Sequence, residues 1–347
     1  MTTPHTVEIR PYTALDVDAE FARIVDELTR RGFLTGAAGT AALFGLAACG
    51  SPANPTDSSA GAATRTIDTP RGPVQVPVHP KRVVFISNLA MYCGFDLGVT
   101  AIGSTLKADA AVPARYAAQF AKAKPVGTPD SSPDFEAIAA LHPDLIIGLN
   151  TKDWIYPQLD DVAPTVYMPH GSGVGWRDSA AFVADALNRP AGLDRLKKQY
   201  AGQITQIKDR YGDVIDKYTW DAISDYTGGQ WWIVGGPGDG NIGDMLLELG
   251  IRLAKASASL DPEKQENPSY ERLGMLDDAG VLLYWINDDG TPIFSDGQLL
   301  TNRLYRRLPA VEAGRSFGFK NMSIASYGQA LDALSELESI LAKLQTH

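Results

Sequence analysis

The sequence predicts an α/β protein built from two similar Rossmann-like lobes that are joined by a single long helix. Short apolar runs alternate with helical segments, which is typical of parallel βαβ units. The same succession of segments occurs twice, and a long amphipathic segment separates the two occurrences. The chain has 347 residues, of which 44% are hydrophobic and 21% charged, so two domains with sizeable cores are possible.

The first lobe is expected over residues 65–190. It begins with an alternating strand, continues with apolar runs that are typical of buried strands, and places helices between them. Gly98 ends the first of these helices, and Pro133 marks the first turn of another. The expected strands are 74–78, 83–87, 99–102 and 145–149, and the expected helices are 89–97, 116–121 and 133–141.

The joining helix is expected over residues 191–213. Its larger side chains recur at steps of three or four residues, which places them on one helical face; they are Leu193, Leu196, Tyr200, Ile204, Ile207 and Tyr211. A helix of roughly 20 residues rises about 30 Å, which is enough to run along both lobes. Because a continuous helix resists bending, we expect only a small adjustment between the lobes.

The second lobe is expected over residues 214–347, with strands at 219–224, 231–234 and 281–286, helices at 242–249 and 268–276, and a terminal amphipathic helix at 327–344. Two features of the first lobe return in order. Leu97-Gly98-Val99 matches Leu249-Gly250-Ile251, and a Pro-x-aromatic-Glu helix precedes an apolar strand in both halves. A single larger doubly wound domain is the alternative.

The amino-terminal segment has the pattern of a targeting signal. Arg30 and Arg31 precede an uncharged run of small and apolar residues that ends at Cys49. This pattern is similar to a twin-arginine (Tat) export signal joined to a lipoprotein cleavage box, and the run is too short for a comfortable membrane span. We therefore expect residues 1–48 to be a Tat-type lipoprotein signal peptide, Cys49 to carry the lipid anchor, and residues 49–64 to form a flexible tether.

The composition argues against a nucleic-acid partner, a disulfide framework and a metal site. The net charge of −10 leaves no basic excess, which argues against binding to nucleic acid. Cys49 and Cys93 are the only cysteines, so a disulfide framework is excluded, although one bridge between them stays arithmetically possible. His79 and His142 each precede proline in a turn, which leaves only His170 as a mid-chain candidate ligand, so no metal site or resident cofactor is expected.

One motif has the form of an enzyme site. Residues 238–243 match G-x-G-x-x-G between a strand and a helix, but residues 252–259 are mostly Ala, Ser and charged and do not provide the next strand of a dinucleotide fold. No nucleophile elbow is present. The sequence therefore predicts a protein that is not an enzyme.

Several segments in order resemble the iron-siderophore and cobalamin class of ABC-transporter solute-binding lipoproteins. They cover roughly residues 65–345 and follow a lipobox and a Pro-rich tether. The segments are His79-Pro80-Lys81-Arg82-Val83-Val84, Leu97-Gly98-Val99, Phe135-Glu136-Ala137-Ile138, Pro143-Asp144-Leu145-Ile146-Ile147 and Leu308-Pro309-Ala310-Val311.

The resemblance implies a monomeric, extracytoplasmic, lipid-anchored protein that captures an Fe(III)-siderophore in a cleft between its lobes and delivers it to an ABC permease. It also implies that one acidic residue on each lobe docks onto the permease, and by position these are Glu136 and Glu248. A haem or cobalamin binder is the alternative within the class, with Tyr92 as a possible haem ligand. An exported enzyme or a surface interaction protein is the alternative outside it.

Candidate ligand contacts follow the predicted strands, because ligands of open α/β sheets lie beyond the carboxyl ends of the strands. Aromatic rings and a few cations suit a bulky anionic chelate. The candidates are Asn88, Tyr92, Lys107, Trp154, Tyr226, Trp231, Trp285, Arg303 and Tyr305. The loop at residues 128–131 lacks the arginine that some hydroxamate binders of the family place there, which leaves the ligand class open.

Overall fold

A computed structural model describes residues 63–108, 110, 112–128, 132–150, 157–169, 174–237, 242–261, 267–293 and 298–346. Arg30, Arg31, Cys49 and Trp154 lie outside these residues, as do the signal peptide and nearly all of the tether. The described chain opens with an antiparallel hairpin, of which only the second strand was expected. Its strands are β1 (Thr64–Thr69) and β2 (Gly72–Pro77).

The first sheet has five parallel strands in the order β5-β4-β3-β6-β7. They are β3 (Val83–Phe85), β4 (Ala101–Ser104), β5 (Lys124–Pro125), β6 (Leu145–Leu149) and β7 (Thr165–Met168). The helices of this lobe are α2 (Asn88–Asp96), η1 (Ala114–Tyr116), α3 (Ala117–Phe120), α4 (Phe135–Ala140), η2 (Pro157–Asp161) and α5 (Trp176–Ala186). Ser87 caps α2 and Asp134 caps α4, each through its side chain, which fixes where these helices begin.

The second sheet has the order β10-β8-β11-β12, with β9 antiparallel to β8. Its strands are β8 (Thr219–Tyr226), β9 (Gln230–Ile233), β10 (Arg252–Leu253), β11 (Val281–Trp285) and β12 (Ser316–Phe319). The helices are α7 (Ile242–Glu248), α8 (Lys255–Ala258), η4 (Tyr270–Leu276), α9 (Gln298–Thr301), α10 (Arg303–Arg306), α11 (Pro309–Glu312) and α12 (Tyr327–Gln345). The two-residue strand β10 corrects our expectation that residues 252–259 hold no strand.

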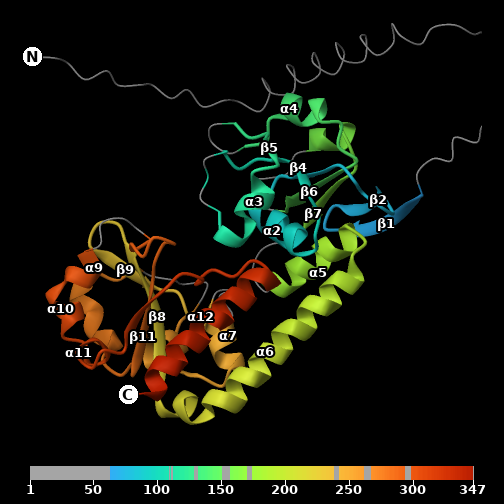
Figure 1. Cartoon of the computed structure of the whole chain (residues 1–347). Coiled ribbons are helices and arrows are strands. Elements are labelled where there is room, and N and C mark those ends of the chain that lie inside the picture. The colour runs from blue at the N-terminus through green and yellow to red at the C-terminus, as the bar shows by residue number, and fades with distance from the viewer. Residues whose placement is uncertain are drawn as a thin grey trace, which may run out of the picture. The chain divides into compact units, whose positions relative to one another are not determined.

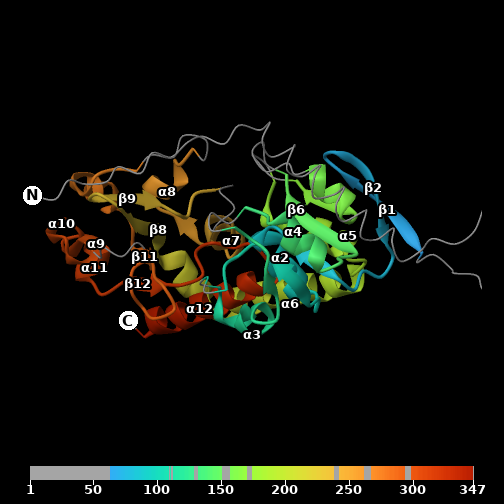
Figure 2. The same ribbon diagram turned by 90° about the horizontal axis from the view of Figure 1, so that it is seen from above.

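The two sheets repeat one topology. The order β4-β3-β6-β7 in the first corresponds to β10-β8-β11-β12 in the second, and these strands are parallel in both. Within the described residues the sheets form separate groups of strands (Figures 1 and 2) and share no strand, so the alternative of a single larger doubly wound domain is wrong. The prediction of two similar α/β lobes is confirmed.

The long helix between the two sheets is α6 (Pro190–Lys217), which has 28 residues. It begins earlier than expected because Pro190 supplies the fixed backbone angle of a first helical turn, and it ends later because Val214 and Ile215 extend its buried face. Tyr211 has non-helical angles (φ −120°, ψ 15°), which makes a kink near the carboxyl end. Figure 1 shows α6 running past α5 and α12, both of which it contacts.

One hydrophobic cluster includes residues of both sheets. It draws on β3 and β8 and on the helices α2, α5, α6, α7 and α12. The outer face of each sheet has a smaller cluster of its own, built around Ile138 in the first lobe and Trp231 in the second. The lobes are therefore packed on each other through a common core.

Asp221 is a fully buried carboxyl group in the second lobe. Its Oδ1 accepts a hydrogen bond from the Ser257 backbone N–H at 3.0 Å. Burial, with a smaller contribution from Asp278, raises its pKa from 3.8 to about 6. The unfolded chain therefore loses this proton at lower pH than the folded chain. Ionisation of Asp221 consequently lowers the free energy of unfolding as pH rises from about 4 to about 6.

We expect Asp221→Asn to remove this pH-dependent loss of stability, which is on the order of 3 kcal/mol. Asparagine can still accept from Ser257 N–H, and it carries no charge to bury. Urea unfolding should find the variant more stable than the wild type at pH 7.5 and similar to it near pH 4. The control is Asp209→Asn, an exposed carboxylate on α6. Parallel pH profiles for wild type and Asp221→Asn would contradict the assignment.

Candidate ligand-binding site

In the first lobe, exposed polar side chains follow the carboxyl ends of two neighbouring strands. Asn88 is exposed at the first position of α2, three residues after β3, and Lys107 is exposed shortly after β4. Because β3 and β4 pair in parallel, these side chains come from the same edge of the sheet. This placement agrees with their selection as candidate contacts, and whether they touch a ligand stays a prediction.

Tyr92, by contrast, belongs to the core of the first lobe. Its side chain is only 6% exposed, and its ring stacks on Tyr116 with centroids 4.9 Å apart and an interplanar angle of 11°. Burial raises the pKa of Tyr92, which disfavours the phenolate needed to coordinate haem iron. The ring therefore supports the lobe and presents little surface to a ligand.

In the second lobe, two tryptophans lie at the carboxyl end of the sheet. Strand register places Trp232 of β9 opposite Ser224 of β8, and Ser224 lies one position beyond the last pair of β8 with β11, next to Trp285. The two indole rings are stacked at 6.2 Å with an interplanar angle of 29°, and both residues are partly buried. The Trp285 indole N–H donates to the Lys320 carbonyl oxygen at 3.1 Å, which fixes that ring.

The Trp232 indole N–H has no hydrogen-bond partner among the residues that the structure describes, although the nitrogen is buried. Tyr226 follows on the same face at the end of β8 and is half-buried. A pair of rings with an adjacent tyrosine therefore lies at this end of the second sheet, and its contact with a ligand stays a prediction.

Trp231 and Tyr305, two of the predicted contacts, are buried. Trp231 is fully buried, and its indole N–H donates to the Ser269 carbonyl oxygen at 3.1 Å. Tyr305 is 3% exposed, and its hydroxyl lies 2.6 Å from Ser316 Oγ. Side chains alternate between the faces of a strand, so Trp231 faces the outer core and Trp232 the other side. Both residues therefore present little surface to a ligand in this arrangement, and their role as contacts stays a prediction.

Arg303 lies on a short helix of the second lobe. It is exposed at the start of α10, which packs against η4. Its contact with a ligand stays a prediction. Trp154 lies outside the described residues, and so does most of the 128–131 loop.

The two predicted docking residues differ in their surroundings. Glu136 is exposed in the first turn of α4. Glu248 is the last residue of α7, and both of its carboxylate oxygens are engaged within the chain, one by Arg177 Nη2 at 2.6 Å and the other by the Tyr200 hydroxyl at 2.7 Å. Both carboxylate oxygens of Glu248 therefore already have a partner within the chain, whereas Glu136 is exposed on the surface of α4.

The residue equivalent to Glu136 is Glu271. In the first lobe, helix α4 precedes β6, which lies between β3 and β7 in the sheet. In the second lobe, η4 precedes β11, which lies in the equivalent place between β8 and β12. Each helix carries an exposed glutamate in its first turn. The Pro-x-aromatic-Glu match between the two halves contains Glu271 and is the sequence signal that relates it to Glu136.

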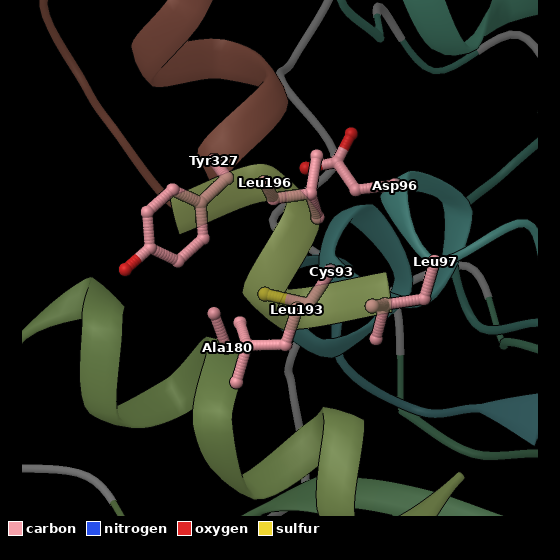
Figure 3. A pocket seen from close by; sticks show the side chains of 7 residues that line it. All are labelled: Cys93, Asp96, Leu97, Ala180, Leu193, Leu196 and Tyr327. Carbon is pink, nitrogen blue, oxygen red and sulfur yellow. The ribbon is translucent and has the colours of Figure 1, made fainter. Parts of the chain in front are cut away.

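The recess shown in Figure 3 lies where α2, α5, α6 and α12 meet. Its empty volume is about 170 Å³. Pockets for small molecules usually measure about 300–1,000 Å³, so this recess is a packing gap at a helix junction. Its lining residues are Cys93, Asp96, Leu97, Ala180, Leu193, Leu196 and Tyr327.

The cysteine in this recess is buried. The Cys93 thiol lies 3.3 Å from the Ala325 carbonyl oxygen, and burial raises its pKa. Cys49 is outside the described residues. Over the described parts of the chain, no group of three or more His, Cys, Asp or Glu side chains could hold a metal ion. Nor does any helix there have the length and hydropathy needed to cross a bilayer.

Comparison with known proteins decides the family. Residues 97–321 match the family described as "Periplasmic binding protein". The chain belongs to this family. Periplasmic binding proteins are solute-binding proteins, which agrees with the prediction of a binding protein that is not an enzyme.

This periplasmic binding protein has named relatives. It is 26% identical over 287 residues to the "Probable siderophore-binding lipoprotein YfiY" of Bacillus subtilis, covering 79% of this chain and 86% of YfiY. It is 26% identical over 291 residues to the "Iron(3+)-hydroxamate-binding protein FhuD" of the same organism, covering 78% of this chain and 85% of FhuD.

A solved structure shares the fold. It is described as the siderophore periplasmic binding protein from the fuscachelin gene cluster of Thermobifida fusca, and the TM-score is 0.67 at 23% identity. The match covers 77% of this chain and 98% of that one. The predicted fold, two α/β lobes of this class, is confirmed.

Proposed function

We propose that this periplasmic binding protein captures a ferric siderophore and delivers it to an ABC permease. The observation that carries the proposal is the match to the siderophore-binding relative YfiY over most of the folded chain. The tryptophan pair at the carboxyl edge of the second sheet supports it, because a flat aromatic surface suits a bulky, partly apolar chelate. Lys107 on the first lobe and Arg303 on the second add cations for metal-bound oxygens.

A metal chelate fits the described residues better than a bare ion. Capture of a free cation needs several converging carboxylates, imidazoles or thiolates, and the part of the chain that the structure describes contains no such group. In a chelate the siderophore supplies the iron ligands, so the protein needs only apolar contact and a few charged or donor groups.

The protein is proposed to act outside the cytoplasm on a lipid anchor. Arg30 and Arg31 support export, and Cys49 supports lipid attachment. Stable anchoring takes more than one acyl chain, which a lipid-modified amino-terminal cysteine can provide. The folded part is proposed to act as a monomer at the outer face of the membrane.

Docking onto the permease is assigned to Glu136 and Glu271, with Glu271 in place of Glu248. The two residues occupy equivalent first-turn positions in the two lobes, and both are exposed. Met275 and Leu304 are exposed apolar side chains on η4 and α10, which pack together, so apolar surface lies on the same helices. One carboxylate per lobe fixes orientation and increases the rate of encounter more than it adds affinity.

Tryptophan fluorescence of the purified protein tests the ligand assignment. We expect saturable quenching by one ferric siderophore and none by its iron-free form, because the Trp232–Trp285 pair reports on the site. Ferric hydroxamates, ferric catecholates, ferric citrate, haem and cobalamin form the panel. Trp285→Ala should reduce the quenching amplitude and weaken binding roughly tenfold, since an aromatic contact contributes on the order of 1 kcal/mol beyond its buried area. Saturation by haem or cobalamin alone, or by nothing in the panel, would contradict the proposal.

A further inference from the structure

Two acidic residues occupy equivalent positions at the ends of equivalent helices. Asp96 is the last residue of α2, directly before Leu97 and Gly98, and Glu248 is the last residue of α7, directly before Leu249 and Gly250. Each carboxylate contacts the amino-terminal turn of a helix that follows the last strand of the other lobe. Asp96 contacts α12, which follows β12, and Glu248 contacts α5, which follows β7.

The Asp96 contact is closed to solvent. Its Oδ2 accepts from the Gly328 backbone N–H at 2.6 Å, and its Oδ1 accepts from the Tyr116 hydroxyl at 2.8 Å. Arg115 lies 3.6 Å from the same carboxylate, and the Asp96 side chain is 6% exposed. The Tyr116 hydroxyl also lies 2.7 Å from Ser326 Oγ, the side chain that caps α12. A buried charge held by this many partners is costly to separate from them.

The Glu248 contact is open to solvent. Its partners are Arg177 Nη2 at 2.6 Å and the Tyr200 hydroxyl at 2.7 Å, and the Arg177 and Glu248 side chains are 34% and 40% exposed. The Arg177 guanidinium stacks on the Trp176 ring at 4.2 Å, which orients it. Water can replace the partners of a half-exposed ion pair, so its separation costs little.

Aromatic rings lie between the two contacts. Trp176 and Tyr327 are the first residues of α5 and α12, and their rings meet edge to face at 4.8 Å. Tyr200 of α6 contacts both rings, at 5.9 Å and 6.0 Å. These rings belong to the shared core, so the junction between the lobes has an apolar centre.

We propose that the two acidic contacts join the lobes as a matched pair of clasps of unequal strength. The exposed Glu248–Arg177 contact breaks easily, and the buried Asp96–Gly328 contact stays formed. The lobes then move by separating at Glu248 and turning about the aromatic centre and the Asp96 contact. Breaking the releasable clasp shifts the lobes toward a more open arrangement and shortens the retention of bound ligand. The second consequence rests on the proposed function, whereas the first does not.

Interlobe distance is the direct test. Nitroxide labels on cysteines introduced at the exposed positions Glu136 and Glu271, in a Cys49→Ser background, report the distance by pulsed electron resonance; Cys93 is buried and shielded from the label. We expect a narrow distribution for the parent protein and an added longer-distance population for Glu248→Arg and for Arg177→Glu. The exchange variant R177E/E248R should regain the narrow distribution, because it restores the opposite charges.

Matched variants distinguish loss of the Glu248–Arg177 clasp from a general loss of stability. Glu312→Arg, at an exposed carboxylate on α11, should leave the distribution unchanged. Asp96→Ala should lower the melting temperature by several degrees, whereas Glu248→Arg should change it little. Unchanged distances in both single variants, or an exchange variant as broad as either, would overturn the proposal.

Ligand retention gives the second readout. With the ferric siderophore that saturates the fluorescence signal, Glu248→Arg should increase the dissociation rate about fivefold, as expected for loss of one half-exposed charged contact. A broadened distance distribution with an unchanged dissociation rate would overturn the retention claim. If no chelate binds the parent protein, the proposed function fails, and the distance measurement still decides the clasp.

Discussion

Replacing Gly328 with alanine should lower the free energy of unfolding by about 2–4 kcal/mol. Gly328 is the second residue of α12, and a methyl group there would overlap the Asp96 carboxylate and the Arg115 guanidinium. Arg115 can swing away, but Asp96 is buried and holds the Tyr116 hydroxyl and the Gly328 N–H. Alanine favours a helix over glycine by about 1 kcal/mol, which is too little to offset this displacement. Urea unfolding measures the difference.

Gly202 provides the matched control. It also lies within a long helix, α6, but a Cβ built there meets no atom within 4 Å. Gly202→Ala should therefore stabilise the protein by about 0.5–1 kcal/mol. Equal effects of the two substitutions would show that the Asp96 contact with α12 does not constrain this position.

Charge reversal at Glu136 and Glu271 together should reduce uptake of the ferric chelate by roughly tenfold or more while leaving its binding in solution unchanged. Both side chains are exposed in first turns and belong to no predicted ligand contact, so Glu136→Lys with Glu271→Lys removes only the attraction to a permease. Uptake of labelled iron by cells and fluorescence titration of the purified variant measure the two effects separately.

The same experiment distinguishes Glu271 from Glu248. Glu136→Lys with Glu248→Lys should also speed ligand dissociation in solution, because the Glu248 carboxylate is engaged by Arg177 and Tyr200, whereas the Glu271 pair should leave binding in solution unchanged. Glu312→Lys is the control for added positive charge on the second lobe. Unchanged uptake in the Glu136 and Glu271 double variant would remove the docking assignment.

Much of the fold could be predicted because its signals are local. The helix 327–344 was expected from its period and is observed as α12, residues 327–345. The parallel strands were expected from continuous apolar runs, such as the one observed as β6, which is buried along nearly its whole length. The weakest expectations concerned short elements, since β10 has two residues and too little sequence to carry a pattern.

The site was harder to predict because it depends on register. Trp231 and Trp232 are neighbours in sequence, and only the pairing of β9 with β8 decides which one shares a face with Trp285. Tyr92 lies on α2, shortly after β3, and Tyr305 lies on α10, and packing turns both side chains into the core. For docking, position relative to Leu249-Gly250 selected Glu248, whereas the correspondence of the two halves relates Glu248 to Asp96 and Glu136 to Glu271.

The contacts of α2 with the region just before and within α12 also govern the order of folding. Asp96 with Gly328, and Cys93 with Ala325, join residues 232 positions apart in the chain. Closing so long a loop is slow, and the contacts that stabilise it form only when both of its ends have been synthesised. During synthesis the first lobe can therefore complete these contacts only after the amino-terminal turn of α12 has been made.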